Sequence, residues 1–241
     1  MKLLAFDTST DHISIALTCP VGGVAQVWQH DGAGGALASG SLIPAIEALM
    51  AQAGLRYAAL DAIAFGQGPG SFTGLRTACA VAQGLAFGAG IPVLPVDTLL
   101  MLAEQARCAH FDTAASVRVL ALLDARMDEL YAAHYAWEQD RWTQVGEHQL
   151  TSPESLELSD SQVLVGNVFA AYGARLPASA KLPRHETLPS ALAMLRLAPA
   201  LLAAGHAVDP ALALPRYVRD KVAKTTLERA AEKVAPMPTR S

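Results

Sequence analysis

Short apolar runs and alternating polar and apolar positions dominate the first thirty residues. Residues 3–6 form an apolar run typical of a buried strand, whereas residues 12–17 and 24–29 alternate as half-buried strands do. A proline and two glycines within residues 20–23 supply the turn between the latter two segments. The pattern predicts a three-stranded antiparallel meander with a polar loop after its first strand.

Helical and strand patterns alternate over the next eighty residues. Leu42, Ile46 and Leu49 recur on one face at helical spacing, which predicts a helix over residues 42–53 that Ser41 caps and Gly54 ends. The next predicted elements are a strand over residues 61–65, a helix over 71–87, a strand over 91–96 and a helix over 98–107.

The element order partly repeats in the second half of the chain. Strands are predicted over residues 117–123, 130–137, 142–150 and 163–165, with short helices after residues 152 and 166 and a last helix over 190–204. This order predicts an α/β fold of two lobes, each a mixed sheet flanked by helices. We assign residues 1–109 to the first lobe, 110–189 to the second, 190–218 to a segment that packs back on the lobes, and 219–241 to a mobile basic tail.

The composition is that of a folded protein without a strong net charge. Of 241 residues, 52% are hydrophobic and 17% charged, the mean hydropathy is +0.27 and the net charge is −4. These values exclude a disordered chain and a bulk nucleic-acid binder. The three cysteines lie far apart and no signal peptide is recognised, so we expect a cytoplasmic protein. Residues 77–96 carry no charge, but glycines and prolines interrupt them before a membrane-spanning helix is complete, and no membrane contact is expected.

The end of the chain differs from the rest in charge. Residues 216–241 hold seven basic and three acidic side chains. A tail of this kind contacts RNA or an acidic partner, or it is simply a solvated, frayed terminus, which is the commoner case.

Motifs for metal-dependent or nucleophilic catalysis are missing from the sequence. No two of the seven histidines lie three or four residues apart, and neither HExxH nor GxSxG occurs. We therefore expect no catalytic residues and no metal ligands in this chain.

A glycine-rich turn points instead to phosphate. Residues 66–74 lie between a predicted strand and a predicted helix, where free amides and the helix dipole favour an anion, but they lack the lysine of a P-loop. Asp7 either holds a metal–phosphate group or closes a hairpin turn, and Ser71 also suits the N-cap of the following helix. The candidates for phosphate or nucleotide contact are Asp7, Thr8, Ser9, Gly68, Gly70 and Ser71.

Small residues line one face of the predicted helix 71–87. Gly74, Ala78, Ala82 and Ala86 recur every four residues, and so little side-chain bulk lets another helix approach closely. That helix belongs to a partner, or the face packs on the protein's own sheet. The predicted partner surface consists of Leu42, Ile46, Leu49, Met50, Thr73, Gly74, Thr77, Ala78, Val81, Ala82 and Leu85.

Five segments together resemble one bacterial family. They are Asp7-Thr8-Ser9, GQGPGSFTGLR at residues 66–76, AQGLA at 82–86, DARMDELY at 124–131 and PRYVR at 215–219. These segments are similar to the TsaB (YeaZ) family, and the resemblance runs from Met1 to about Lys224.

The resemblance implies both a fold and a role. The fold is that of the actin/Hsp70/sugar-kinase superfamily, with RNase H-like lobes, and the role is in making threonylcarbamoyladenosine beside the anticodon of ANN-decoding tRNAs. The resemblance further implies a non-catalytic scaffold that pairs with the transferase TsaD through the helices 42–53 and 71–87. The ATPase TsaE joins them, tRNA is reached through the complex, and the scaffold dimerises when alone.

Two details qualify this picture. ATP and the metal belong to the partners in that family, so no cofactor is expected here. Ala38 stands about where family members commonly have a histidine, a departure that weighs further against a metal site.

The alternative is a stand-alone ATP-dependent enzyme of the same superfamily, with Asp7 and the 66–74 turn around the phosphates, and a peptidase is a weaker third option.

Overall fold

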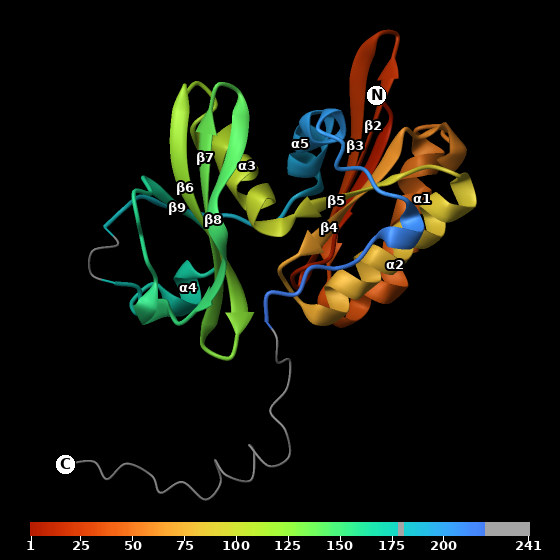
Figure 1. Cartoon of the computed structure of the whole chain (residues 1–241). Coiled ribbons are helices and arrows are strands. Elements are labelled where there is room, and N and C mark those ends of the chain that lie inside the picture. The colour runs from red at the N-terminus through yellow and green to blue at the C-terminus, as the bar shows by residue number, and fades with distance from the viewer. Residues whose placement is uncertain (178–180, 220–241) are drawn as a thin grey trace, which may run out of the picture.

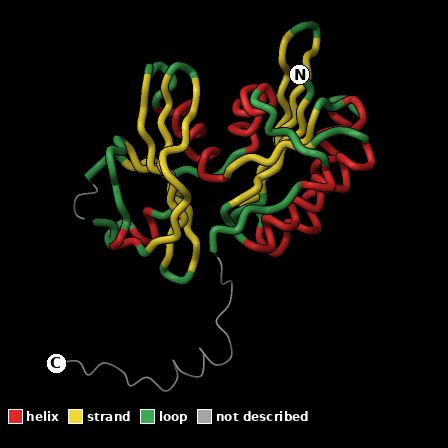
Figure 2. Tube along the Cα trace, in the orientation of Figure 1, coloured by secondary structure: helices red, strands yellow, loops and turns green. Residues whose placement is uncertain are grey.

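Two five-stranded sheets, with helices around the first and between the two, give the molecule its two lobes (Figure 1). The structure is a computed structural model that describes residues 1–177 and 181–219. Figure 2 shows that most of the helical turns lie on or beside the first sheet. The predicted mobile tail lies outside the described residues, apart from Arg219.

The first sheet contains β1 (Leu3–Asp7), β2 (His12–Val21), β3 (Val24–Ala33), β4 (Ala62–Gly68) and β5 (Val93–Asp97). The strand order is β3-β2-β1-β4-β5, with β1, β2 and β3 antiparallel and with β4 and β5 parallel to β1. The predicted meander is therefore confirmed. Because β1 is central and flanked on both sides, it is buried along its whole length.

The second sheet contains β6 (Ser116–Arg126), β7 (Glu129–Glu138), β8 (Arg141–Thr151), β9 (Val163–Gly166) and β10 (Arg184–Glu186). Its order, β10-β9-β6-β7-β8, has the same sequence of antiparallel and parallel pairs as the first sheet. The expected repeat of element order and the two-lobed α/β fold are confirmed. The strand β10 was not predicted, because three residues are too few to show an alternating pattern.

Helices cover both faces of the first sheet (Figure 1). On one face α1 (Ala38–Gln52) and α2 (Phe72–Ala89) enclose an apolar core with the side chains of β1, β2 and β4. On the other face α5 (Ala191–Ala203) packs on β1 and β2. The shorter helical pieces are α4 (Phe169–Tyr172) and the 3₁₀ turns η1 (Gly35–Leu37), η2 (Tyr57–Ala59), η3 (Pro153–Ser155) and η4 (Pro210–Leu212).

The helix α3 (Thr98–His110) lies between the lobes. Its residues Leu99 and Leu102 pack in the core of the second sheet, whereas Met101 packs with the first sheet and α5. The helix that the sequence assigns to the first lobe therefore contributes to both cores.

The start of α1 corrects the sequence prediction. The helix begins at Ala38, four residues before the predicted start, and Ser41 is inside it rather than at its cap. The Ser41 hydroxyl donates to the carbonyl of Leu37 (2.9 Å), and Ala38 is buried. Because Ala38 is buried, the apolar stripe extends one turn further toward the N-terminus. A helix start assigned from a capping residue at Ser41 leaves that turn out.

The end of the described chain returns to the first lobe after α5. Val208 pairs with Val93 at the edge of β5, and the Gln83 side chain donates to the carbonyls of Pro210 and Ala213 (both 3.1 Å). This segment therefore runs along α2 (Figure 1). Among the helices of the described residues, none is long and apolar enough to cross a membrane.

Candidate functional site

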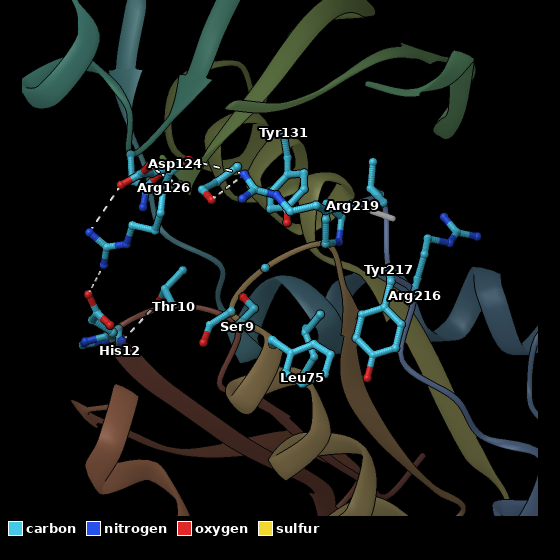
Figure 3. A pocket seen from close by; sticks show the side chains of 18 of the residues that line it. Ser9, Thr10, His12, Leu75, Asp124, Arg126, Tyr131, Arg216, Tyr217 and Arg219 are labelled. Atoms are coloured by element: carbon cyan, nitrogen blue, oxygen red, sulfur yellow. Dashed lines mark hydrogen bonds and ion pairs between the residues drawn. The ribbon is translucent and has the colours of Figure 1, made fainter. Parts of the chain in front are cut away.

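A cleft of about 450 Å³ lies between the lobes, where β1 and β6 end (Figure 3). The ends of β1 and β6, the first strands of the two sheets, face each other across this space. The first lobe contributes the residues after β1 and the glycine-rich turn, and the second lobe contributes the end of β6. Residues 216–219 line the cleft as well.

The glycine-rich turn between β4 and α2 packs directly on the residues that follow β1. A Cβ atom at Gly74 would lie 1.8 Å from the carbonyl oxygen of Thr8, and one at Gly70 would lie 2.7 Å from the backbone oxygen of Ser9. The Thr8 hydroxyl donates to the carbonyl of Gly74 (2.7 Å), and the amide of Ser71 donates to the carbonyl of Ser9 (2.7 Å). Glycine is therefore required at both positions, because the backbone after β1 passes too close to leave room for a side chain.

The six residues predicted for phosphate contact divide into two sets. Three of them line the cleft, namely Ser9, Gly70 and Ser71. The other three, Asp7, Thr8 and Gly68, make contacts within the fold, and a Cβ atom at Gly68 would lie 2.6 Å from the carbonyl of Arg216. Ser71 does cap α2 as predicted, since its hydroxyl accepts from the amide of Gly74 (3.5 Å). Phosphate binding by this set stays a prediction.

Asp7 is a buried carboxyl group with one oxygen in use. Its Oδ1 accepts from the amide (3.0 Å) and the hydroxyl (2.7 Å) of Ser9, which closes the turn after β1. Its Oδ2 is buried without a hydrogen-bond partner, and a Cβ atom at Gly66 would overlap it. Burial raises the pKa of Asp7 from 3.8 to about 6, although the hydrogen bonds from Ser9 oppose the shift.

The second-lobe wall of the cleft is a polar network around Asp124. The Asp124 carboxylate accepts from the amide of Arg126 (2.7 Å) and the hydroxyl of Tyr172 (3.1 Å), while Asn167 accepts from the amide of Asp124 (2.9 Å). The Arg126 guanidinium pairs with Asp11 of the first lobe, so this contact spans the cleft (Figure 3). The DARM segment was identified from the sequence, whereas Asp11 and Asn167 were not, because neither belongs to a motif.

Asp97 joins both lobes at the base of α3. Its Oδ1 caps the helix by accepting from the amide of Leu99 (2.8 Å) and also accepts from the hydroxyl of Tyr135 (3.1 Å). Its Oδ2 pairs with His148 (2.6 Å) and Arg216 (3.1 Å). Burial and the nearby Asp97 carboxylate raise the pKa of Tyr135 well above its usual value. Asp97 was not predicted from the sequence, although a residue between an apolar run and a helix is a recognisable N-cap position.

Most of the predicted partner surface is buried inside the chain, which corrects that prediction. Seven of its eleven residues belong to the core, namely Leu42, Ile46, Leu49, Met50, Gly74, Ala78 and Ala82. The physical reason is that their stripes face the protein's own sheet, where they pack with Phe6 and Phe65. The alternative considered for the small stripe, packing within the fold, is the arrangement observed. Four residues stay at least partly exposed: Thr73, Thr77, Val81 and Leu85.

The outward side of α2 nevertheless carries small residues along much of its length, with Arg76 and Phe87 as bulky exposed exceptions. Thr73, Ala80, Gly84 and Gly88 are exposed along it, and no atom lies within 4 Å of a Cβ built at either glycine. On α1 the exposed residues include Ile43, Pro44 and Glu47. These outward sides of α1 and α2 form what we call the helix face.

Metal-ligating side chains do not converge in the part of the chain that the structure describes. Within residues 1–177 and 181–219, no group of three or more histidine, cysteine or acidic side chains is placed to hold a metal ion. Two histidines do meet, since the rings of His110 and His185 stack with centroids 3.9 Å apart. Burial and the neighbouring His110 lower the pKa of His185.

Comparison with known proteins gives consistent relatives. Residues 38–235 match the family model described as TsaD, tRNA N6-adenosine threonylcarbamoyltransferase. The tRNA threonylcarbamoyladenosine biosynthesis protein TsaB of Haemophilus influenzae is 34% identical, with 92% of this chain and 95% of the relative covered. TsaB of Escherichia coli is 32% identical, with coverages of 92% and 96%. The solved structure of YeaZ from Pseudomonas aeruginosa is 36% identical and superposes with a TM-score of 0.78, covering 90% of this chain and 99% of that one.

Proposed function

The chain belongs to the TsaB family of tRNA threonylcarbamoyladenosine biosynthesis proteins, and from this we propose that it serves in forming that nucleoside as a subunit that pairs with the transferase TsaD. The observation that carries the proposal is the similarity to TsaB proteins over almost the full length of both chains. The match to the transferase family model supports a paralogous relation between the two subunits. The modified position is then the adenosine next to the anticodon of ANN-decoding tRNAs.

We further propose that the chain leaves the transfer chemistry to TsaD. The spacing of all seven histidines supports this division, since no pair stands one helical turn apart in the sequence. The glycine-rich turn supports it too, because its glycines accommodate the chain's own backbone at Thr8 and Ser9. On this proposal ATP and metal are held by the partner subunits, and tRNA is reached through the complex.

The helix face is the surface that we assign to TsaD. Of the predicted set it retains the exposed Thr73 and the partly buried Thr77, Val81 and Leu85, the last two of which also pack against the core, and it adds the exposed Ala80 and Gly84. Small side chains on an outward helical side allow a partner helix to pack closely, as the sequence argument requires, but on the side opposite to the buried stripe. We assign self-association of the free chain to the same face, and TsaE to the assembled pair.

A substitution on the helix face tests the partnership. Ala80→Trp adds bulk at an exposed position, so the variant is expected to fold normally and to bind TsaD at least about tenfold more weakly. The matched control is Ala200→Trp, at an alanine on α5 that is also exposed. Binding is measured by surface plasmon resonance with purified TsaD. Equal affinities for Ala80→Trp and wild type would remove the helix face from the interface.

Reconstitution tests the role itself. TsaD, TsaE, ATP, threonylcarbamoyl-AMP and tRNA are mixed with and without this chain, and the modified nucleoside is quantified by mass spectrometry. We expect formation of the product to depend on the chain. No described contact favours the alternative of a stand-alone ATP-dependent enzyme, and turnover of Mg-ATP by the purified chain alone would speak for it.

A further inference from the structure

Residues 215–219, which we call the strap, cross from the first lobe to the second at the mouth of the cleft (Figure 3). On the first lobe the amide of Arg216 donates to the carbonyl of Gln67 (2.8 Å), and the Gln67 side chain donates back to the carbonyl of Leu214 (3.1 Å). The Arg216 guanidinium also pairs with Asp97 (3.1 Å). The strap is therefore fixed to the end of β4 and to the end of β5.

Tyr217 ties the strap to the first turn of α2. Its ring lies 5.2 Å from that of Phe72, and its hydroxyl accepts from Nε of Arg76 (3.0 Å). The Arg76 guanidinium in turn sits 3.8 Å above the Phe72 ring. These contacts place a third first-lobe anchor beside the helix face.

Arg219 carries the strap onto the second lobe. Its Nη2 donates to the carbonyl of Ala125 (3.0 Å) and to the carboxylate of Glu129 (2.6 Å), and lies 3.4 Å from the carbonyl of Arg126. The three acceptors lie at the end of β6 and the start of β7, on either side of the turn between these strands. The side chain of Arg219 is only 12% exposed, so these charge-assisted contacts are shielded from water.

The turn that receives Arg219 has an unusual backbone. Arg126, Met127 and Asp128 all have positive φ, at 60°, 56° and 61°. Left-handed conformation is unfavourable for residues other than glycine, and three in succession need support from their surroundings. The carbonyls that Arg219 binds lie at the start of this turn, so the arginine supports it directly.

A second contact between the lobes is independent of the strap. Glu104 on α3 is buried and accepts from the indole of Trp142 in β8 (2.9 Å) and from Arg196 on α5 (3.1 Å). These contacts hold the second sheet and the first-lobe helix α5 to the same α3 side chain. The Glu104 contacts therefore join the lobes through α3 without involving the strap.

We propose that the strap is a clasp that holds the two lobes closed over the cleft, with Arg219 as the latch on the β6–β7 turn. The inference goes beyond the proposed function, because it concerns the mobility of the lobes and holds whether or not TsaD is the partner. It also gives a role to the PRYVR segment, which the proposed partnership does not use.

The test compares Arg219→Gln with Arg175→Gln in the full chain. Arg175 is a suitable control because it also pairs with two carboxylates, Glu154 (2.6 Å) and Asp128 (2.7 Å), yet stays within the second lobe. Hydrogen exchange reports on the β6–β7 turn, and the radius of gyration from small-angle scattering reports on lobe separation. Arg219→Gln is expected to speed amide exchange in residues 125–130 about tenfold or more and to increase the radius of gyration.

Arg175→Gln is expected to leave the radius of gyration at the wild-type value. Glu129→Gln removes the ion pair but keeps the carbonyl contacts, so it serves in place of Arg219→Gln if that variant does not fold, with both changes expected to be smaller. Unchanged exchange in the turn would overturn the latch. Faster exchange with an unchanged radius of gyration would show that Arg219 supports only the turn, and would overturn the clasp.

Discussion

The buried carboxyl group of Asp7 allows a prediction of how stability depends on pH. Its folded pKa is about 6, against 3.8 for an exposed aspartate. Since one pKa unit corresponds to about 1.4 kcal/mol, ionisation of Asp7 in the folded state costs about 3 kcal/mol at neutral pH. The structural cause is the buried Oδ2 without a partner, beside the backbone of Gly66.

The sign of the pH dependence follows from the protons that the folded and unfolded states bind. Between pH 3.8 and about 6 the folded protein holds a proton on Asp7 that the unfolded chain has released. The stabilisation that the protonated Asp7 gives the folded state is therefore complete below pH 3.8, and it is lost as the pH rises through about 6. Asp7→Asn has no group to ionise. The free energy of unfolding of the variant minus that of wild type is therefore expected to be about 3 kcal/mol larger at pH 7.5 than at pH 3.5.

The measurement is urea denaturation followed by tryptophan fluorescence at those two pH values. The difference between variant and wild type is compared at each pH, so that all other titrating groups cancel. Asp112→Asn is the control, because its carboxylate is 73% exposed and its removal is expected to give nearly the same difference at both pH values. A difference for Asp7→Asn that does not change with pH would refute the reasoning.

Two further predictions concern positions where side-chain size or charge matters within the fold. Gly74→Ala places a methyl group 1.8 Å from the carbonyl of Thr8 and is expected to destabilise the protein by several kcal/mol, whereas Gly84→Ala meets no atom within 4 Å and is expected to stabilise it by about 1 kcal/mol. Equal effects of the two changes on urea denaturation would contradict the packing described for the glycine-rich turn. Glu104→Ala leaves the buried partners of that carboxylate without an acceptor, including the Trp142 indole, and is expected to lower the free energy of unfolding by about 3–5 kcal/mol. A loss below about 1 kcal/mol in a calorimetric melt would show that Glu104 does not join the lobes.

Local patterns were sufficient to predict most elements of the fold. The alternation in residues 12–17 and 24–29 correctly predicted strands, although burial does not follow it: residues 13–17 of β2 are all buried, and residues 24–29 of β3 are exposed except for the partly buried Trp28. Ser71 marks the start of α2 because its hydroxyl accepts from an amide that the helix terminus leaves free, whereas the predicted end at residue 87 lies two residues before the observed end at Ala89. Such signals are short-range, so they survive in the sequence without knowledge of the fold.

The side of a helix that faces the core was decided by the tertiary structure. Gly74, Ala78 and Ala82 form a stripe of small residues in any helix, and a partner helix and the protein's own sheet demand the same small side chains. The stripe itself therefore does not distinguish the two, and the structure turns it inward.

The residues that meet in the cleft were also decided by the tertiary structure. The sequence determined that Ser9, Gly70 and Ser71 stand at the ends of a strand and a helix, but their neighbours across the cleft, Asp124 and Arg219, lie far away along the chain. Their meeting depends on how α3 sets one sheet against the other, through side chains packed on both. A local sequence pattern does not contain the relative orientation of the two sheets, because that orientation arises from the packing of two cores on one helix.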